Sequence, residues 1–212
     1  MSEKQRSTTE ILADADATLA TAKFGMEDLL RAGGDRRLAG LSNVVVWGRA
    51  VTNVLQNLRS TEPSFDAWYA PIVEEMRNDL LLRFFYDLRS ALLKRGGRPT
   101  STSVHIKSLS FPGDMARFGP PPPNATSFFI GDQTGGSGWE VRLPDGSLGK
   151  YYVEFPDEIG RVELVMRDAP KSHLGKAVTD ASVVQLAAYY LEYLENLVQQ
   201  AKQRFGTASS TG

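Results

Sequence analysis

LSNVVVWGRAVTNVLQNL, residues 41–58, is the stretch of sequence that decides the fold. Its apolar positions recur at helical spacing and form one stripe, made of Leu41, Val44, Val45, Gly48, Val51, Leu55 and Leu58. Most of the circumference becomes apolar once the stripe is widened by Val46, Trp47, Ala50 and Val54. A helix that is apolar nearly all round is usually buried by neighbouring helices or by a partner subunit. The sequence therefore predicts a central helix over about residues 35–59, and the breadth of its apolar surface favours a homodimer.

Three further helices are predicted around this one. The first begins at residues 7–10 (Ser-Thr-Thr-Glu), where hydroxyl groups can cap free amides and an early carboxylate meets the positive end of the dipole. This first helix ends at Gly33-Gly34. A helix over 63–97 follows the central helix, and the last helix runs over about 179–204 with a heptad-like apolar repeat. The helix over 63–97 carries opposite charges four positions apart, which predict ion pairs on an exposed face: Asp79, Arg83 and Asp87.

The pattern of apolar and turn residues changes between residues 98 and 176. Apolar residues there alternate with a period of two, and turn residues such as Pro144-Asp145-Gly146 separate the short runs. This pattern predicts an antiparallel meander inserted ahead of the last helix. The predicted fold class is α+β, mainly α: a four-helix-type bundle with an antiparallel β insertion. It forms a single domain over 1–212, with helices one to three in 7–95, the insertion in 98–176 and the terminal helix in 177–206.

Composition excludes several classes of function. The 24 basic and 25 acidic side chains nearly cancel, so no global positive field attracts nucleic acid, although a local patch could. The chain has no cysteine and only two histidines, and we predict no metal site and no cofactor. Its longest apolar runs, 44–47 and 80–82, are far shorter than the about 20 residues that cross a bilayer. With a polar N-terminus that does not resemble a signal peptide, the sequence predicts a cytoplasmic protein without membrane contact.

A glycine-rich segment, Gly131–Gly138, invites comparison with phosphate-binding loops. It lacks the Gly-Lys-Ser/Thr ending, and the pattern after it is that of a strand. Phosphate-binding loops lead into a helix N-terminus, whose free amides hold the anion. The segment is therefore predicted to be a hairpin turn.

One polar strip interrupts the apolar helix at residues 41–58. Arg49, Asn53 and Gln56 are spaced at i, i+4 and i+7. Polar groups on such a helix must be hydrogen-bonded, lie at a groove or pair across an interface. Two interpretations stay open. The three side chains belong to a buried hydrogen-bond network within the protein, or they belong to a ligand-binding site in which Arg49 and Arg89 form an anion pocket.

A family resemblance is carried by residues 47–56, with Trp47, Arg49 and Val-Thr-Asn-Val-Leu-Gln, and by the segment Arg83–Gly96. These stretches resemble HEPN-type helical bundles, small bacterial four-helix domains of toxin–antitoxin and defence systems. Active members carry an arginine, a polar neighbour and a histidine four to six residues after the arginine, and a dimer brings two motifs together as a metal-independent ribonuclease. The resemblance implies that Arg89 is the motif arginine and Ser90 its neighbour. Lys94 then stands where the family has histidine, and a lysine is a poor general base at neutral pH unless burial lowers its pKa.

Three functions follow as expectations. The leading one is an HEPN-like module that acts by binding, as a homodimer with a cognate protein partner, in a toxin–antitoxin or defence context. The second is a metal-independent ribonuclease that binds RNA, with Arg89 and Lys94 as catalytic residues. The third is a sensor for a small molecule or nucleotide, held by Arg49, Asn53, Gln56 and Arg89. Against all three, Arg89 at the end of a helix is also typical of a simple dipole or ion-pair residue.

Overall fold

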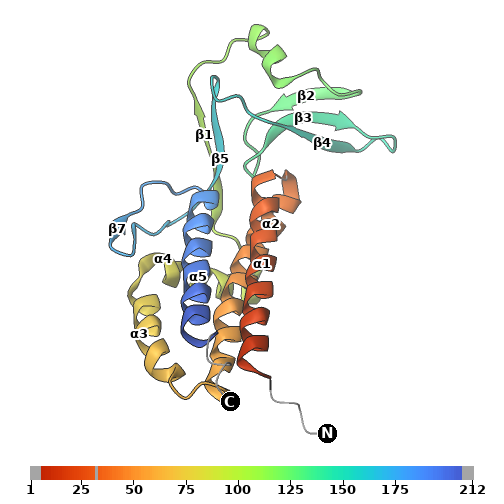
Figure 1. Cartoon of the computed structure of the whole chain (residues 1–212). Helices are drawn as coiled ribbons and strands as arrows, with labels where there is room; N and C mark the ends of the chain where they lie inside the picture. The colour runs from red at the N-terminus through yellow and green to blue at the C-terminus, as the bar shows by residue number, and fades with distance from the viewer. Residues whose placement is uncertain (1–5, 32, 207–212) are drawn as a thin grey trace.

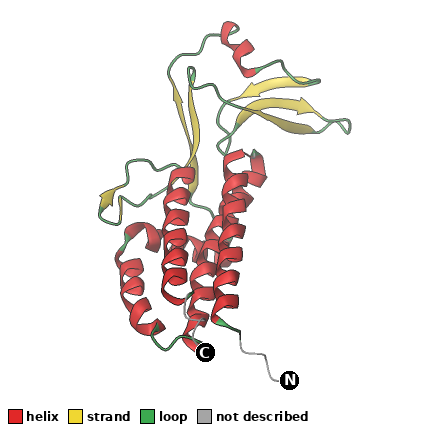
Figure 2. Cartoon of the chain, viewed as in Figure 1, coloured by secondary structure: helices red, strands yellow, loops and turns green. Residues whose placement is uncertain are grey.

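The computed structural model of the chain describes residues 6–31 and 33–206. A helical body carries a β-rich arm at one end (Figures 1 and 2). Three long helices lie side by side in the body: α1 (Thr8–Arg31), α2 (Gly34–Leu55) and α5 (Val183–Phe205). The fold class is thus α+β with antiparallel sheets ahead of the last helix, as predicted. Across the described ranges, no helix has the length and apolar character needed to traverse a bilayer.

The pair α1 and α2 packs with its backbones in close approach. Gly25 and Gly40 face each other, and a β carbon built on Gly40 would lie 2.6 Å from the carbonyl oxygen of Gly25. Because neither residue has a side chain, the two helices can touch at this point. Helix α2 also contacts α4 and α5, and the stripe that it buries includes Leu41, Val44, Val45, Val51 and Leu55. Trp47, which widened the apolar surface in the sequence, is 42% exposed.

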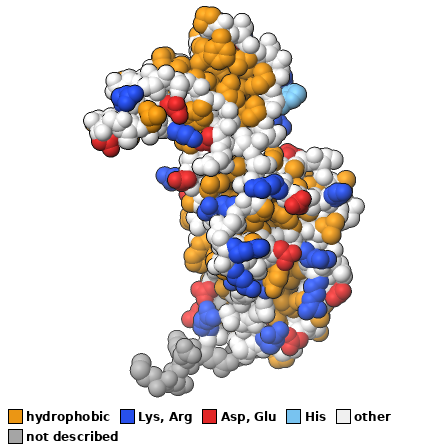
Figure 3. All heavy atoms as spheres, turned by 180° about the vertical axis from the view of Figure 1, so that it is seen from behind, with side chains coloured by type: hydrophobic (Ala, Val, Ile, Leu, Met, Phe, Trp, Pro, Cys, Tyr) orange, Lys and Arg blue, Asp and Glu red, His pale blue; other side chains and the backbone are white. Residues whose placement is uncertain are grey.

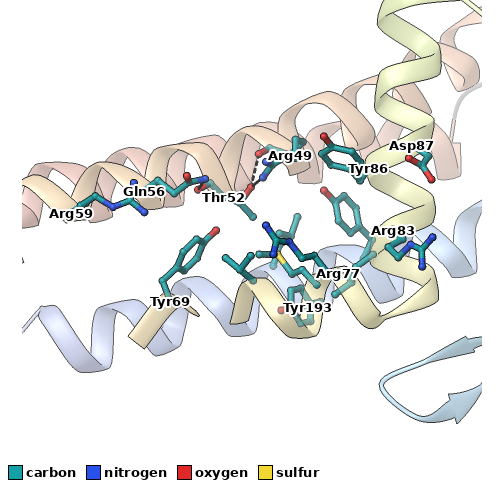
Figure 4. Close-up of a pocket in the computed structure, with 15 residues that line it drawn as sticks. Arg49, Thr52, Gln56, Arg59, Tyr69, Arg77, Arg83, Tyr86, Asp87 and Tyr193 are labelled. Atoms are coloured by element: carbon teal, nitrogen blue, oxygen red, sulfur yellow. Dashed lines mark hydrogen bonds between the residues drawn. The ribbon is translucent and has the colours of Figure 1, made fainter. Parts of the chain in front are cut away.

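The third predicted helix is in fact two helices. A 3-10 turn, η1 (Gln56–Ser60), leads into α3 (Phe65–Asn78), and α4 (Leu80–Arg95) follows after a break at Asp79, whose ψ is 127°. The Asp79 carboxylate caps α4 by accepting a 2.9 Å hydrogen bond from the Leu82 N–H. Helix α4 then crosses the direction of α2 and α5 (Figure 4).

The expected ion pairs along this stretch do not form. Among the described residues, Arg83 makes no ion pair with Asp79 or with Asp87. Asp79 is instead occupied by the α4 cap and by the His173 ring, whose Nδ1 lies 3.0 Å from its carboxylate. The Asp79 carboxylate is thus engaged by the cap and the His173 ring, which explains why it does not pair with Arg83. Arg83 and Asp87 lie four positions apart within α4, so helical spacing alone does not bring these two side chains together.

The arm, residues 100–166, consists of a ribbon and a small sheet. The ribbon pairs β1 (Thr100–Ile106) with β5 (Gly160–Met166), in register from Thr100 opposite Met166 to Ile106 opposite Gly160. The chain between β1 and β5 forms η2 (Gly113–Phe118) and an antiparallel sheet of β2 (Ala125–Phe129), β3 (Ser137–Arg142) and β4 (Leu148–Val153). A short hairpin, β6 (Ser172–His173) with β7 (Lys176–Ala177), connects the arm to α5. Hydrophobic side chains gather over the arm when the molecule is viewed from behind (Figure 3).

The segment Gly131–Gly138 forms the turn between β2 and β3, which confirms the predicted hairpin. Asp132 organises this turn. Its carboxylate accepts hydrogen bonds from the Thr134 and Gly136 amides, the Thr134 hydroxyl, Lys150 and the Tyr152 hydroxyl, at 2.6–3.1 Å. The turn also contacts α2, because Arg37 donates a 2.7 Å hydrogen bond to the carbonyl of Gly135. Asp132 therefore fixes the conformation of the turn through which the arm contacts the helical body.

The charge of Asp132 makes stability depend on pH. Burial disfavours the carboxylate, but hydrogen bonds from Lys150, Thr134, Tyr152 and the Gly136 amide outweigh it, so the pKa of Asp132 lies well below its usual 3.8. A depressed folded pKa stabilises the protein above the unfolded pKa, and this contribution disappears as the pH falls toward the folded value. We expect Asp132→Asn to lower the free energy of unfolding by about 2 kcal/mol at pH 7, and the deficit to shrink as the pH falls below about 4.

Urea unfolding at pH 7, 4 and 2.5 measures this difference. The exposed Asp157, whose side chain takes no part in the turn, provides the matched Asp157→Asn control, which should follow the wild type at every pH. An Asp132→Asn deficit that stays constant from pH 7 to pH 2.5 would contradict the assignment.

Candidate functional site

A cavity with a volume of about 560 Å³ lies between α2, α3, α4 and α5. We call it the arginine cavity, because Arg49, Arg59, Arg77 and Arg83 line it and Asp87 is its only carboxylate among the described residues. Four tyrosines complete its polar wall: Tyr69, Tyr86, Tyr190 and Tyr193. A chain that is nearly neutral overall thus concentrates positive charge in one place.

One side of the cavity is built from α2 and η1. Arg49, Thr52, Gln56 and Arg59 are spaced three or four positions apart and so share one helical face (Figure 4). Arg49 donates a hydrogen bond to the Thr52 hydroxyl, and its guanidinium carbon lies 5.7 Å from the centre of the Tyr86 ring. The Gln56 amide donates a 3.1 Å bond to the backbone carbonyl of Thr52. Arg49 and Gln56 are therefore held in place by Thr52.

The opposite side comes from α3 and α4. Figure 4 shows Arg77 reaching from α3 into the space that faces Arg49 and Thr52, with Arg83 and Asp87 farther along on α4. Within the part of the chain that the structure describes, neither Arg77 nor Arg83 forms a hydrogen bond or an ion pair. Arg59, by contrast, is paired with Asp66 at 2.7 Å. Arg77 and Arg83 are thus the two arginines whose donors are available to a ligand.

A buried hydroxyl group also points to a ligand. Tyr69 is 4% exposed, and its hydroxyl has no hydrogen-bond partner among the described residues. Burial raises the Tyr69 pKa, while Arg49 and the nearby Thr52 side chain act in the opposite direction without completing a bond of good geometry. A buried polar group without a partner costs about 1–3 kcal/mol. A ligand that bonded this hydroxyl would recover that cost.

Tyr190 and Tyr193 stay neutral and form part of the cavity wall. Tyr190 stacks on Phe85 with ring centres 4.2 Å apart, and burial raises its pKa against the influence of Arg49. Burial also raises the pKa of Tyr193, together with the 2.9 Å hydrogen bond that its hydroxyl donates to Glu75. Because both hydroxyls remain protonated, the charge of the cavity is set by its arginines and Asp87.

The predicted ligand-binding residues are only partly brought together. Arg49 and Gln56 line the arginine cavity, whereas Asn53 is exposed and Arg89 is half-buried outside it. In the cavity, Arg49 is therefore faced by Arg77 and not by Arg89 (Figure 4). Lys94, the second predicted catalytic residue, is exposed and also lies outside the cavity.

A second cavity of about 390 Å³ lies between α3, α5 and the β6–β7 hairpin. His173 lines it, and its Nδ1 lies 3.0 Å from the Asp79 carboxylate. Tyr193 lines both cavities. Over residues 6–31 and 33–206, no three histidine, aspartate or glutamate side chains are grouped so that they could hold a metal ion.

Comparisons with known proteins give no relative: no family model matches this chain, and no curated protein or solved structure matches it. Function is therefore inferred from the geometry and charge of the arginine cavity.

Proposed function

We propose that this chain is a binding module that senses a small phosphorylated molecule in the arginine cavity. The observation that supports this proposal is the presence of two arginines, Arg77 and Arg83, without a protein partner in a cavity that already holds Arg49. A planar guanidinium presents paired donors that match the oxygens of a phosphate, and such charge-assisted bonds are among the strongest in proteins. Arginines gathered in one cavity also repel one another, and a bound anion relieves that repulsion.

The chemistry of the lining favours binding over acid–base catalysis. General acids and bases work best with a pKa near the operating pH. The tyrosines with shifted values, Tyr69, Tyr190 and Tyr193, have pKa values moved upward, away from neutrality. The lining includes no histidine among the described residues. A sensor, the third function expected from the sequence, thus fits the cavity better than a ribonuclease.

The sequence resemblance remains part of the proposal. HEPN-like character, a four-helix-type bundle, a homodimer and a toxin–antitoxin or defence context all agree with a module that acts by binding, with a cognate protein as a further partner. The ribonuclease alternative stays a prediction that rests on Arg89 and Lys94. Neither residue belongs to the arginine cavity.

Titration calorimetry with inorganic pyrophosphate at low salt tests the proposal. We expect Arg77→Gln to weaken pyrophosphate binding by about tenfold to a hundredfold, because one charge-assisted hydrogen bond contributes about 1.5–3 kcal/mol. The matched control is Arg95→Gln, which removes the same charge from an exposed site outside the cavity. It should bind like the wild type. Absence of binding at millimolar pyrophosphate, or equal losses in the two variants, would refute the proposal.

A further inference from the structure

We infer that the ligand of the arginine cavity is a nucleoside phosphate, with its base stacked on Tyr86 and its phosphates held by Arg49 and Arg77. This inference rests on the proposed function and names the class of molecule that the same cavity binds. It draws on three features that a site for phosphate alone would not need: an exposed ring, a free carboxylate and a large volume.

The exposed ring is that of Tyr86 on α4. Its side chain is 55% exposed, although it belongs to the lining of the cavity. Arg49 lies against the ring, with the guanidinium carbon 5.7 Å from the ring centre, and so fixes the ring beside the cationic part of the cavity. Aromatic rings in this setting are the surface on which nucleic acid bases stack, because every base presents a flat π face.

The free carboxylate is that of Asp87, the residue after Tyr86. In the described chain it forms no ion pair with Arg83 or with any other residue. A carboxylate in a site for a bare phosphate would repel the ligand. It is useful when the ligand also carries hydrogen-bond donors, as the ribose hydroxyls and the exocyclic amino group of a nucleoside do.

The arrangement of these groups matches the order of parts in a nucleoside phosphate. Figure 4 shows Arg49 and Arg77 on opposite sides of the middle of the cavity, and Tyr86 and Asp87 at one end of it. The buried Tyr69 hydroxyl adds a donor on the side of Gln56 and Arg59. The volume of about 560 Å³ lies in the range of small-molecule sites and exceeds what a phosphate group would fill.

Titration calorimetry with ADP, ribose 5-phosphate and pyrophosphate tests the inference. We expect ADP to bind about tenfold more tightly than pyrophosphate, the gain that stacking of one base typically gives. Ribose 5-phosphate, which lacks a base, should bind more weakly than ADP. Tyr86→Leu should bring the ratio of ADP to pyrophosphate affinity close to one, and Tyr86→Phe, which retains the ring, should restore it. The ratio is the readout because loss of the ring also releases Arg49 and can weaken both ligands.

The outcomes separate this inference from the proposed function. Equal affinities for ADP and pyrophosphate, both reduced by Arg77→Gln, would overturn the nucleoside and leave the anion site standing. No binding of either ligand would overturn both. A six-nucleotide oligoribonucleotide that bound more tightly than ADP would overturn the small ligand in favour of RNA.

Discussion

Replacing Gly40 by valine is expected to lower the free energy of unfolding by about 3 kcal/mol or more. A β carbon at Gly40 would lie 2.6 Å from the Gly25 carbonyl oxygen and 2.7 Å from the Leu29 nitrogen. Both are backbone atoms of α1, so no side-chain rotation can relieve the clash, and the two helices must move apart. Such a loss is a large fraction of the about 5–15 kcal/mol that stabilises a typical domain. Urea unfolding followed by far-UV circular dichroism measures it.

The control for Gly40→Val makes the same chemical change where space is open. Gly97 lies after α4, and a β carbon there meets no atom within 4 Å. Gly97→Val should change the free energy of unfolding by less than about 0.5 kcal/mol. Equal effects of the two substitutions would show that the close approach of α1 and α2 does not exist in solution.

Asp79→Ala is expected to destabilise the protein by about 3 kcal/mol, because one side chain joins the start of α4 to the β6–β7 hairpin through three contacts. Its carboxylate accepts bonds from the Leu82 amide at 2.9 Å and the Leu174 amide at 2.6 Å, and it contacts the His173 ring at 3.0 Å. Burial opposes its charge, but these bonds lower its pKa below 3.8. The stabilisation is therefore present at neutral pH and fades as the pH falls below about 4.

Two variants make the Asp79 prediction specific. Asp79→Asn keeps an oxygen that can cap α4 and should lose less stability than Asp79→Ala. Asp87→Ala removes an exposed carboxylate from the same helix and should leave thermal unfolding at pH 7 unchanged. If Asp79→Ala and Asp87→Ala unfolded at the same temperature, the role of Asp79 as a junction would be wrong.

Much of the fold could be predicted because its signals are local. Gly96 ends α4 with a φ of 64°, a conformation that glycine adopts easily, and Ser7 and Glu10 bond each other at the start of α1 as a cap does. The hairpin at Gly131–Gly138 could be predicted because this segment lacks the Gly-Lys-Ser/Thr ending of a phosphate-binding loop and is followed by a strand pattern. The break at Asp79 was missed because Leu80, Leu81 and Phe84 continue the helical spacing of the residues before it. Only the cap geometry shows that the helix restarts there.

The candidate site was predicted only where one helix determines it. Arg49 and Gln56 were found from their spacing along α2 and the start of η1, but the face that lines the cavity between them carries Thr52, and Asn53 is exposed to solvent. Thr52, three positions from Arg49, could have been found from the same spacing. Arg77 and Arg83 enter the cavity because α3 and α4 meet at an angle, and the spacing of charges along one helix contains no information about that angle.

The pairing of Thr100 with Met166 means that the chain leaves and re-enters the helical body at one place. Evolution can therefore lengthen, shorten or exchange the arm as a cassette without disturbing the order of the core helices, since both ends of the excursion are already adjacent. Such exchanges are restricted by the ribbon, where a shift of one residue in a single strand would turn every later side chain to the opposite face. Residues must be gained or lost in matched pairs, and any replacement must present a new surface to Arg37 at the start of α2.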